Sequence, residues 1–291
     1  MDRRDPHEAR RSRVPGRNGW WGVVNAHEWR ARDAQEQVLL ENGPRSGESI
    51  VFLHGGNTAR WMWGGQVAGL PGRHLLTPDL PGYGERAGED WPGTAAVTDD
   101  VARTIRSHGI DGRAHVVGLS LGGHVALHLL QRAPDVVRSC IVTGVAAGGL
   151  TPLERRVITP QLPLWRRRWY WTLQARLFFI PREDRARFVA SGVAASDATN
   201  RRMFAEVASG TMPSGPFTYG GPLLVVAGQR EPRSVRDAFA LIGGALPQAS
   251  TWIAPRMHHP WNAQDPGLFN RMVATFVDTG AWPAAEGGSA G

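Results

Sequence analysis

The stretch VVGLSLGGH, residues 116–124, places Ser120 between two glycines, each two positions away. The run before it, residues 114–117, is short, apolar and partly β-branched, which predicts a buried strand. After it, apolar residues recur at helical spacing until Pro134, which predicts a helix. A G-x-S-x-G serine acts as a nucleophile in this context of strand, tight turn and helix. The short motif also arises by chance in a chain with 36 glycines, so its surroundings decide between the two interpretations.

The tight turn itself favours the nucleophile. A serine there has a strained backbone, and side chains larger than glycine at positions 118 and 122 would collide with neighbouring elements. The turn also puts Ser120 at a helix N-terminus, where free N–H groups favour a developing negative charge.

Apolar runs of strand length alternate with helical patterns along most of the chain. The expected strands are 49–54, 74–79, 114–118, 139–144, 222–228 and 250–255, and the expected helices lie near 97–108, 121–132, 234–245 and 266–277. This alternation predicts an α/β fold with a mostly parallel twisted sheet flanked by helices.

A long interval between the fourth and fifth expected strands contains no strand pattern. In it, four apolar residues at spacing four predict a helical stripe, which could also be ordinary helix core: Trp165, Trp169, Leu173 and Leu177. We therefore expect an inserted helical lid within the sheet domain. The predicted organisation is a core of 20–149 and 216–281, a lid of 150–215, and flexible tails at 1–19 and 282–291.

Composition limits the class of protein. No run approaches 18 apolar residues, so no membrane span is expected, and the arginine-rich N-terminus lacks the apolar region of a signal peptide. The single cysteine, Cys140, excludes a disulfide framework and most cysteine metal sites. We expect a cytoplasmic protein, monomeric or homodimeric, without metal or cofactor.

The net charge of +7 comes from arginine alone, because the chain contains no lysine. The excess is local: residues 1–32 hold eight arginines against four acids, and residues 153–187 hold nine against three. No nucleic-acid-binding motif accompanies this charge, so a nucleic-acid partner is not expected.

A serine nucleophile needs a base, normally a histidine oriented by a carboxylate. Only His258 and His259 follow a strand in a loop near the chain end, and we expect His259 to be the base. Glu231 is the only carboxylate in the loop after residues 222–228, because Asp237 falls in the following helix. Ser120, Glu231 and His259 would thus stand beyond the carboxyl ends of parallel strands, where open α/β sheets build their sites.

The tetrahedral intermediate requires two N–H donors. Leu121, directly after the nucleophile, should supply one, and Gly56 or Asn57 in the loop after the first strand should supply the other. The alternative for the Gly-Gly pair at 55–56 is a plain tight turn.

Together, these pieces resemble the α/β-hydrolase family with a helical cap, over about residues 36–280. The matching motifs are HGGN (54–57), DLPGYG (79–84), GLSLGG (118–123), the acid after PLLVVAG (222–228) and HHPWNAQDP (258–266). The resemblance implies Ser120 as nucleophile, Glu231 as acid and His259 as base, with Gly56 and Leu121 as oxyanion donors.

Three features depart from the family pattern. The acid is glutamate rather than aspartate, Arg86 replaces a small hydroxyl residue, and the first 35 residues have no counterpart. Epoxide hydrolases and haloalkane dehalogenases share the fold but have aspartate at the nucleophile position, so Ser120 argues against them.

The substrate class follows from aromatic residues near the site. We expect Trp61, Trp63, Trp165 and Trp169 to line a pocket for a small substrate with an apolar body. The predicted reaction is hydrolysis of an ester, thioester or lactone through a Ser120 acyl-enzyme. The alternatives are C–C bond hydrolysis, acyl transfer or cyclisation on a natural product, or a non-enzymatic ligand receptor on the same fold.

Overall fold

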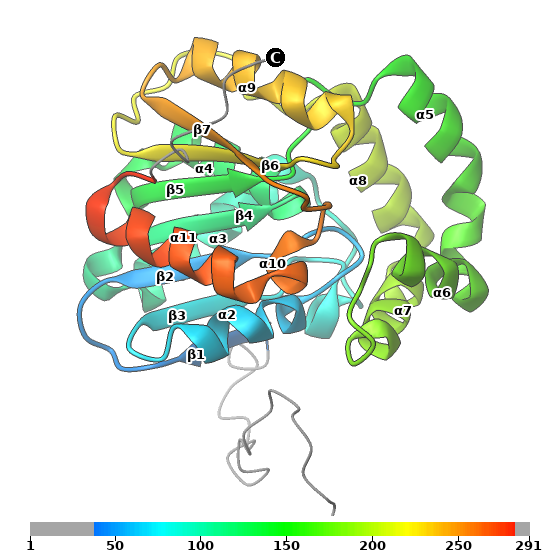
Figure 1. Ribbon diagram of the computed structural model, residues 1–291, viewed down its shortest axis with the longest axis horizontal. Helices are drawn as coiled ribbons and strands as arrows, with labels where there is room; N and C mark the ends of the chain where they lie inside the picture. Colours follow the sequence, from blue (N-terminus) through cyan, green and yellow to red (C-terminus); the bar gives the residue numbers. More distant parts are fainter. Residues whose placement is uncertain (1–37, 283–291) are drawn as a thin grey trace, which may run out of the picture. The chain divides into compact units, whose positions relative to one another are not determined.

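The computed structural model describes residues 38–282, which contain a seven-stranded sheet (Figure 1). Its strand order is β1-β3-β2-β4-β5-β6-β7, and only β1 runs antiparallel to its neighbour. The strands are β1 (Leu39–Asn42), β2 (Ser49–Leu53), β3 (His74–Pro78), β4 (Ala114–Leu119), β5 (Val137–Thr143), β6 (Leu223–Gly228) and β7 (Ala249–Ala254). The predicted fold class is confirmed, and each expected strand is present within two residues of its predicted ends.

Helices cover both faces of the sheet. In Figure 1, α2 (Gly64–Gly69) and α11 (Pro266–Thr279) lie in front, and α3 (Thr94–His108) and α4 (Leu121–Arg132) lie behind. Two apolar clusters result: one contains residues of α2 and α11, and the other contains residues of α3, α4 and α9 (Arg233–Ala245). Strands β2, β4, β5 and β6 are buried along almost their whole length, which explains their continuous apolar sequences.

The long interval between β5 and β6 is helical, as expected, and its helices gather at one side of the sheet (Figure 1). It comprises α5 (Pro152–Ile158), the 3-10 segment η5 (Thr159–Arg166), α6 (Arg168–Leu177), α7 (Arg185–Ala194) and α8 (Asp197–Ser209). We call these elements the helical insertion. The remaining short elements are η1 (Arg60–Trp63), η2 (Gly84–Arg86), η3 (Ile110–Gly112), η4 (Pro134–Val136) and α10 (Trp261–Gln264).

The structure corrects the interpretation of the apolar stripe. Trp165 is buried in η5, whereas Trp169, Leu173 and Leu177 are exposed on α6. The cause is a break at Arg167, whose extended backbone (φ −99°, ψ 121°) separates η5 from α6 and shifts the helical phase. The stripe at spacing four therefore spans two elements, and the buried side of α6 consists of Tyr170, Trp171 and Ala175.

Some expectations concern parts outside the described residues. The predicted tail at 1–19 and nearly all of the one at 282–291 lie there, as does the start of the predicted core at 20–37. Within residues 38–282, no helix is long and apolar enough to cross a membrane.

Candidate active site

Ser120 lies on a strained turn between β4 and α4. Its φ of 54° is in the left-handed region, which serine adopts only at a cost in conformational energy. A β-carbon on Gly118 would lie 2.4 Å from the carbonyl oxygen of Gly122, and one on Gly122 would lie 2.1 Å from that of Leu53. Both glycines are thus required by close backbone approaches, as the sequence argument expected.

Glu231 and His259 meet beyond the ends of β6 and β7. Oε1 of Glu231 lies 2.5 Å from Nδ1 of His259, and Oε2 accepts a hydrogen bond of 2.6 Å from the backbone N–H of Gly228. The glutamate side chain is fully buried and the histidine is partly exposed. The acid therefore stands in a fixed, desolvated position against the imidazole.

The other carboxylates near these residues are engaged elsewhere. Asp237 is exposed on α9 and pairs with Arg233 at 3.3 Å. Asp265 accepts a hydrogen bond of 2.9 Å from the N–H of Leu268 and caps α11.

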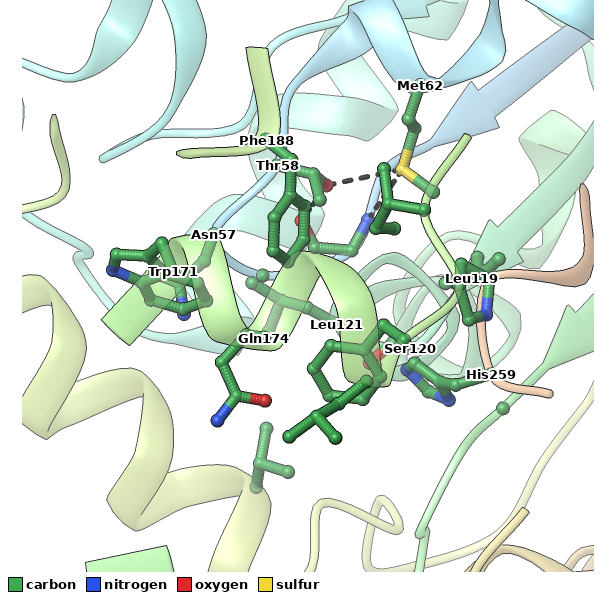
Figure 2. Close-up of a pocket in the computed structure, with 18 of the residues that line it drawn as sticks. Asn57, Thr58, Met62, Leu119, Ser120, Leu121, Trp171, Gln174, Phe188 and His259 are labelled. Carbon is green, nitrogen blue, oxygen red and sulfur yellow. Dashed lines mark hydrogen bonds between the residues drawn. The ribbon is translucent and has the colours of Figure 1, made fainter. Parts of the chain in front are cut away.

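A cavity of about 540 Å³ connects the serine turn, the histidine loop and the helical insertion. Figure 2 shows the side chains of Ser120 and His259 at its wall, together with Trp171 and Phe188 from the insertion. No hydrogen bond joins Ser120 to His259 within the described part of the chain, so proton transfer between them requires a closer approach.

The loop after β2 forms another wall of this cavity, through Gly56, Asn57 and Thr58. A β-carbon on Gly56 would lie 3.7 Å from Cδ2 of Leu121, so the loop lies close to the serine turn. Leu121 is the first residue of α4, and its N–H consequently has no intrahelical acceptor. Asn57 adopts a left-handed φ of 55°, and its buried Oδ1 has no hydrogen-bond partner.

Hydrogen bonds hold the loop in shape. The Thr58 hydroxyl lies 2.6 Å from the Gly55 carbonyl oxygen. The Met62 sulfur lies 3.2 Å from the Thr58 hydroxyl and 3.4 Å from the Gly55 N–H, which donates to it (Figure 2). His54 and Asp79 support the same region, where Oδ1 of Asp79 accepts a hydrogen bond of 2.7 Å from the Arg60 N–H. Nε2 of His54 accepts from the Leu80 N–H at 2.9 Å, which requires a neutral ring, and burial lowers the His54 pKa accordingly.

Of the four tryptophans expected in the pocket, Trp61 and Trp165 line it and the other two do not. Trp63 is fully buried in the core against Phe52 and Phe269, with ring centroids 5.0 and 5.8 Å away. Trp61 and Trp63 are two residues apart in a 3-10 helix of three residues per turn, so they point in different directions. Trp169 projects outward from α6 and is 58% exposed.

Sequence reasoning missed the support that the end of β5 gives to the site. The Thr143 carbonyl accepts from the Ser120 N–H at 2.9 Å, and its hydroxyl accepts from the Trp261 indole at 2.8 Å. A β-carbon on Gly144 would lie within 3.0 Å of both Glu231 and His259. A glycine directly after an apolar strand was the available signal, since active-site loops follow the carboxyl ends of such strands.

The remaining sequence features have structural partners. Arg86 forms ion pairs of 2.7 Å with Glu89 and 2.5 Å with Asp100. Cys140 is buried in β5, and burial raises the pKa of its thiol, so it is not a thiolate at neutral pH. Among residues 38–282, no cluster of three or more histidines, cysteines, aspartates or glutamates could hold a metal ion.

Comparison with known proteins places these features in a family. The sequence profile described as "Alpha/beta hydrolase family" matches residues 50–272. A protein of Gibberella zeae, described as an AB hydrolase superfamily protein, is 28% identical over 254 residues, covering 84% of this chain and 86% of its own. An esterase of Mycobacterium tuberculosis is 33% identical over 106 residues, which are 36% of this chain and 35% of the esterase.

Solved structures show the same architecture. An esterase from Exiguobacterium antarcticum superposes with a TM-score of 0.71 at 18% identity, over 83% of this chain and 95% of its own. The matching profile spans most of the chain, including the serine turn and the histidine loop. The chain therefore belongs to the alpha/beta hydrolase family.

Proposed function

We propose that this protein is a serine hydrolase that cleaves an apolar ester, thioester or lactone through an acyl-enzyme on Ser120. The observation that carries the proposal is the 2.5 Å contact between the buried Glu231 carboxylate and His259, a ring that shares a cavity wall with Ser120. The esterases among the matched proteins support the same class of reaction.

The contact supports the tautomer of His259 that the proposed mechanism needs. With Nδ1–H donating to Glu231, Nε2 of His259 is unprotonated and accepts the proton of the Ser120 hydroxyl. Oγ then attacks the carbonyl carbon, and the N–H of Leu121, with that of Gly56 or Asn57, stabilises the oxyanion. His259 returns the proton to the leaving alcohol or thiol as its bond to the carbonyl carbon breaks, which leaves Ser120 acylated; with a lactone, the released hydroxyl stays on the acyl chain. Water, activated by His259, releases the acid in the same way.

The cavity supports an apolar substrate. Its volume of about 540 Å³ falls in the range of small-molecule sites. The helical insertion contributes mainly aromatic and aliphatic walls: Ile158, Trp165, Trp171, Phe178, Phe188 and Phe204. We propose that residues 150–215 act as a lid that selects the substrate, since these walls face the serine across the cavity.

Covalent labelling tests the proposal. A fluorophosphonate probe should label the wild-type protein, and Ser120→Ala should abolish labelling and turnover while circular dichroism and thermal unfolding stay unchanged. A series of p-nitrophenyl esters of increasing acyl length should then identify the preferred chain. Retained turnover in Ser120→Ala would exclude the acyl-enzyme. A wild-type protein that the probe does not label would instead favour a ligand receptor.

A further inference from the structure

The outer surface of α6 is apolar although it faces solvent. Trp169, Leu173 and Leu177, one helical turn apart, are 58%, 46% and 59% exposed. The opposite side of the helix already packs on the cavity wall and on α7 through Tyr170, Trp171 and Ala175. The exposed row is therefore not the helix's contribution to the core.

Two phenylalanines extend this row. Phe178 and Phe179 follow α6 and are 39% and 56% exposed. Phe179 has a left-handed φ of 56°, a conformation unfavourable for an aromatic residue, and its ring stacks on His258 at 4.2 Å. We define Trp169, Leu173, Leu177, Phe178 and Phe179 as the α6 patch. It contains five of the nine large apolar side chains exposed among residues 38–282.

Arginines border the α6 patch. Arg168 and Arg176 each precede a patch residue on the helix and thus form the adjacent row, while Arg167 and Arg182 flank the segment. All four are exposed, and within residues 38–282 no carboxylate forms an ion pair with any of them. Among residues 38–282, these positive charges therefore have no carboxylate partner beside the apolar row.

The α6 patch also borders the cavity. Leu177 and Phe178 line the cavity and are exposed at the same time, and Gln174, on the same helix, lines it as well (Figure 2). The α6 patch is therefore continuous with one wall of the cavity.

We propose that the α6 patch docks the protein onto an anionic phospholipid surface. Helices that lie in the membrane interface combine Trp, Phe and Leu with a basic polar row, which is the pattern of α6. Tryptophan is enriched at the headgroup region of membranes, and the planar guanidinium groups of Arg168 and Arg176 can bind lipid phosphates in a bidentate way. An acidic protein could form ion pairs with the arginines, but ion pairing alone would not explain the five large apolar side chains beside them. This inference does not depend on the proposed esterase activity.

Vesicle flotation with the full chain tests the proposal. Vesicles of phosphatidylcholine with about 30% phosphatidylglycerol should bind the wild type far better than phosphatidylcholine alone, because each basic residue near such a surface adds attraction. Trp169→Glu with Leu173→Glu should reduce the partition coefficient at least about tenfold, since both side chains lose their apolar contact. Arg168→Gln with Arg176→Gln should reduce it about 10–30-fold.

Matched variants separate the patch from general effects. Leu241 and Ile253 are 42% and 44% exposed outside the insertion, so changing both to Glu adds the same charge elsewhere. Arg103→Gln with Arg271→Gln removes the same charge from exposed positions on α3 and α11. Both control pairs should bind as the wild type does, and thermal unfolding should show that every variant is folded. The arginine-rich N-terminal segment is present in all variants, so it cannot cause a difference among them.

Three results would overturn the proposal. The first is a wild-type protein that does not float with anionic vesicles. The second is binding by the folded Trp169→Glu, Leu173→Glu variant equal to wild type. The third is an equal loss in the control arginine pair, which would attribute binding to net charge alone. Absence of flotation together with binding to an acidic protein would assign the surface to a protein partner instead.

Discussion

The α-carbon of Gly144 faces the ring of His259 so closely that a β-carbon there would lie 2.8 Å from Cε1 and 2.9 Å from Nδ1. Gly144 also has a φ of 69°, which favours glycine. The position of the imidazole thus depends on a residue without a side chain at the end of a different strand.

Gly144→Ala should therefore lower kcat/KM by about 100-fold or more, because displacing a catalytic group by about 1 Å is that costly. It should also lower the free energy of unfolding by about 1–2 kcal/mol through the left-handed backbone. Gly243→Ala is the control, since Gly243 lies in α9 with open space around it. This substitution should raise the free energy of unfolding by about 0.5–1 kcal/mol. Ester hydrolysis and urea unfolding measure both effects. Wild-type kcat/KM in Gly144→Ala would mean that the ring position is not held there.

Glu231→Gln should reduce kcat by about 10²–10⁴-fold, because glutamine keeps the size of the side chain but loses the charge that stabilises protonated His259. Asp237→Asn is the control for a carboxylate on the next element, and it should change kcat less than about twofold because Asp237 pairs with Arg233 on the surface. If Asp237→Asn is inactive and Glu231→Gln is active, Glu231 is not the acid of the triad.

The neighbouring histidines should differ sharply. His259→Ala should be as inactive as Ser120→Ala, whereas His258→Ala should lose less than about tenfold in kcat/KM. His258 instead stacks on Phe179, and Gln264 lies 3.2 Å from its Nδ1, so its removal loosens the loop without removing the base. The same p-nitrophenyl ester assay distinguishes them. If His258 proves essential and His259 does not, His258 is the base of the triad.

Buried neutral histidines should make the protein acid-sensitive. Burial, aided by nearby His128 and His259, lowers the pKa of His124 from 6.5 to about 3. Below about pH 6.5 the unfolded chain binds a proton at this site that the native protein does not bind, so stability falls as the pH decreases towards 3. His124→Asn should flatten this dependence by up to about 1.4 kcal/mol per pH unit.

Urea unfolding of both proteins at several values between about pH 7 and pH 4.5 measures this slope. Burial also lowers the pKa of His54, His115 and His128, but these histidines contribute equally to the slopes of the wild type and of His124→Asn. Equal slopes would show that His124 is not held neutral.

The sequence predicted the strands that carry the site because parallel strands are buried on both faces and read as continuous apolar runs. Strand β1 was not predicted, because its four residues, LLEN, are only half-buried at the sheet edge and do not form a continuous apolar run. Chain order and loop position were sufficient to select Glu231 and His259, which the structure brings into contact.

The pocket walls could not be predicted equally well. Side-chain direction there depends on where a helix breaks, and the break at Arg167 has neither glycine nor proline to mark it. The phase of α6, and with it the exposure of Trp169, follows from tertiary packing of Trp171 against Trp165 and Phe188. Identifying Trp63 as a core residue likewise required the partners Phe52 and Phe269, which are distant in sequence.

The Thr143–Gly144 pair has a consequence for the order in which activity can arise. The Thr143 carbonyl accepts a hydrogen bond from the serine turn, and the Thr143 hydroxyl accepts one from the Trp261 indole in the histidine loop. The α-carbon of Gly144 lies against the imidazole of His259. During synthesis the proposed nucleophile, Ser120, emerges long before the proposed base, His259, whose loop is held against β5 through the Trp261 indole. With the proposed triad, turnover by a nascent or truncated chain would thus report that the segment carrying His259 and Trp261 has docked on β5.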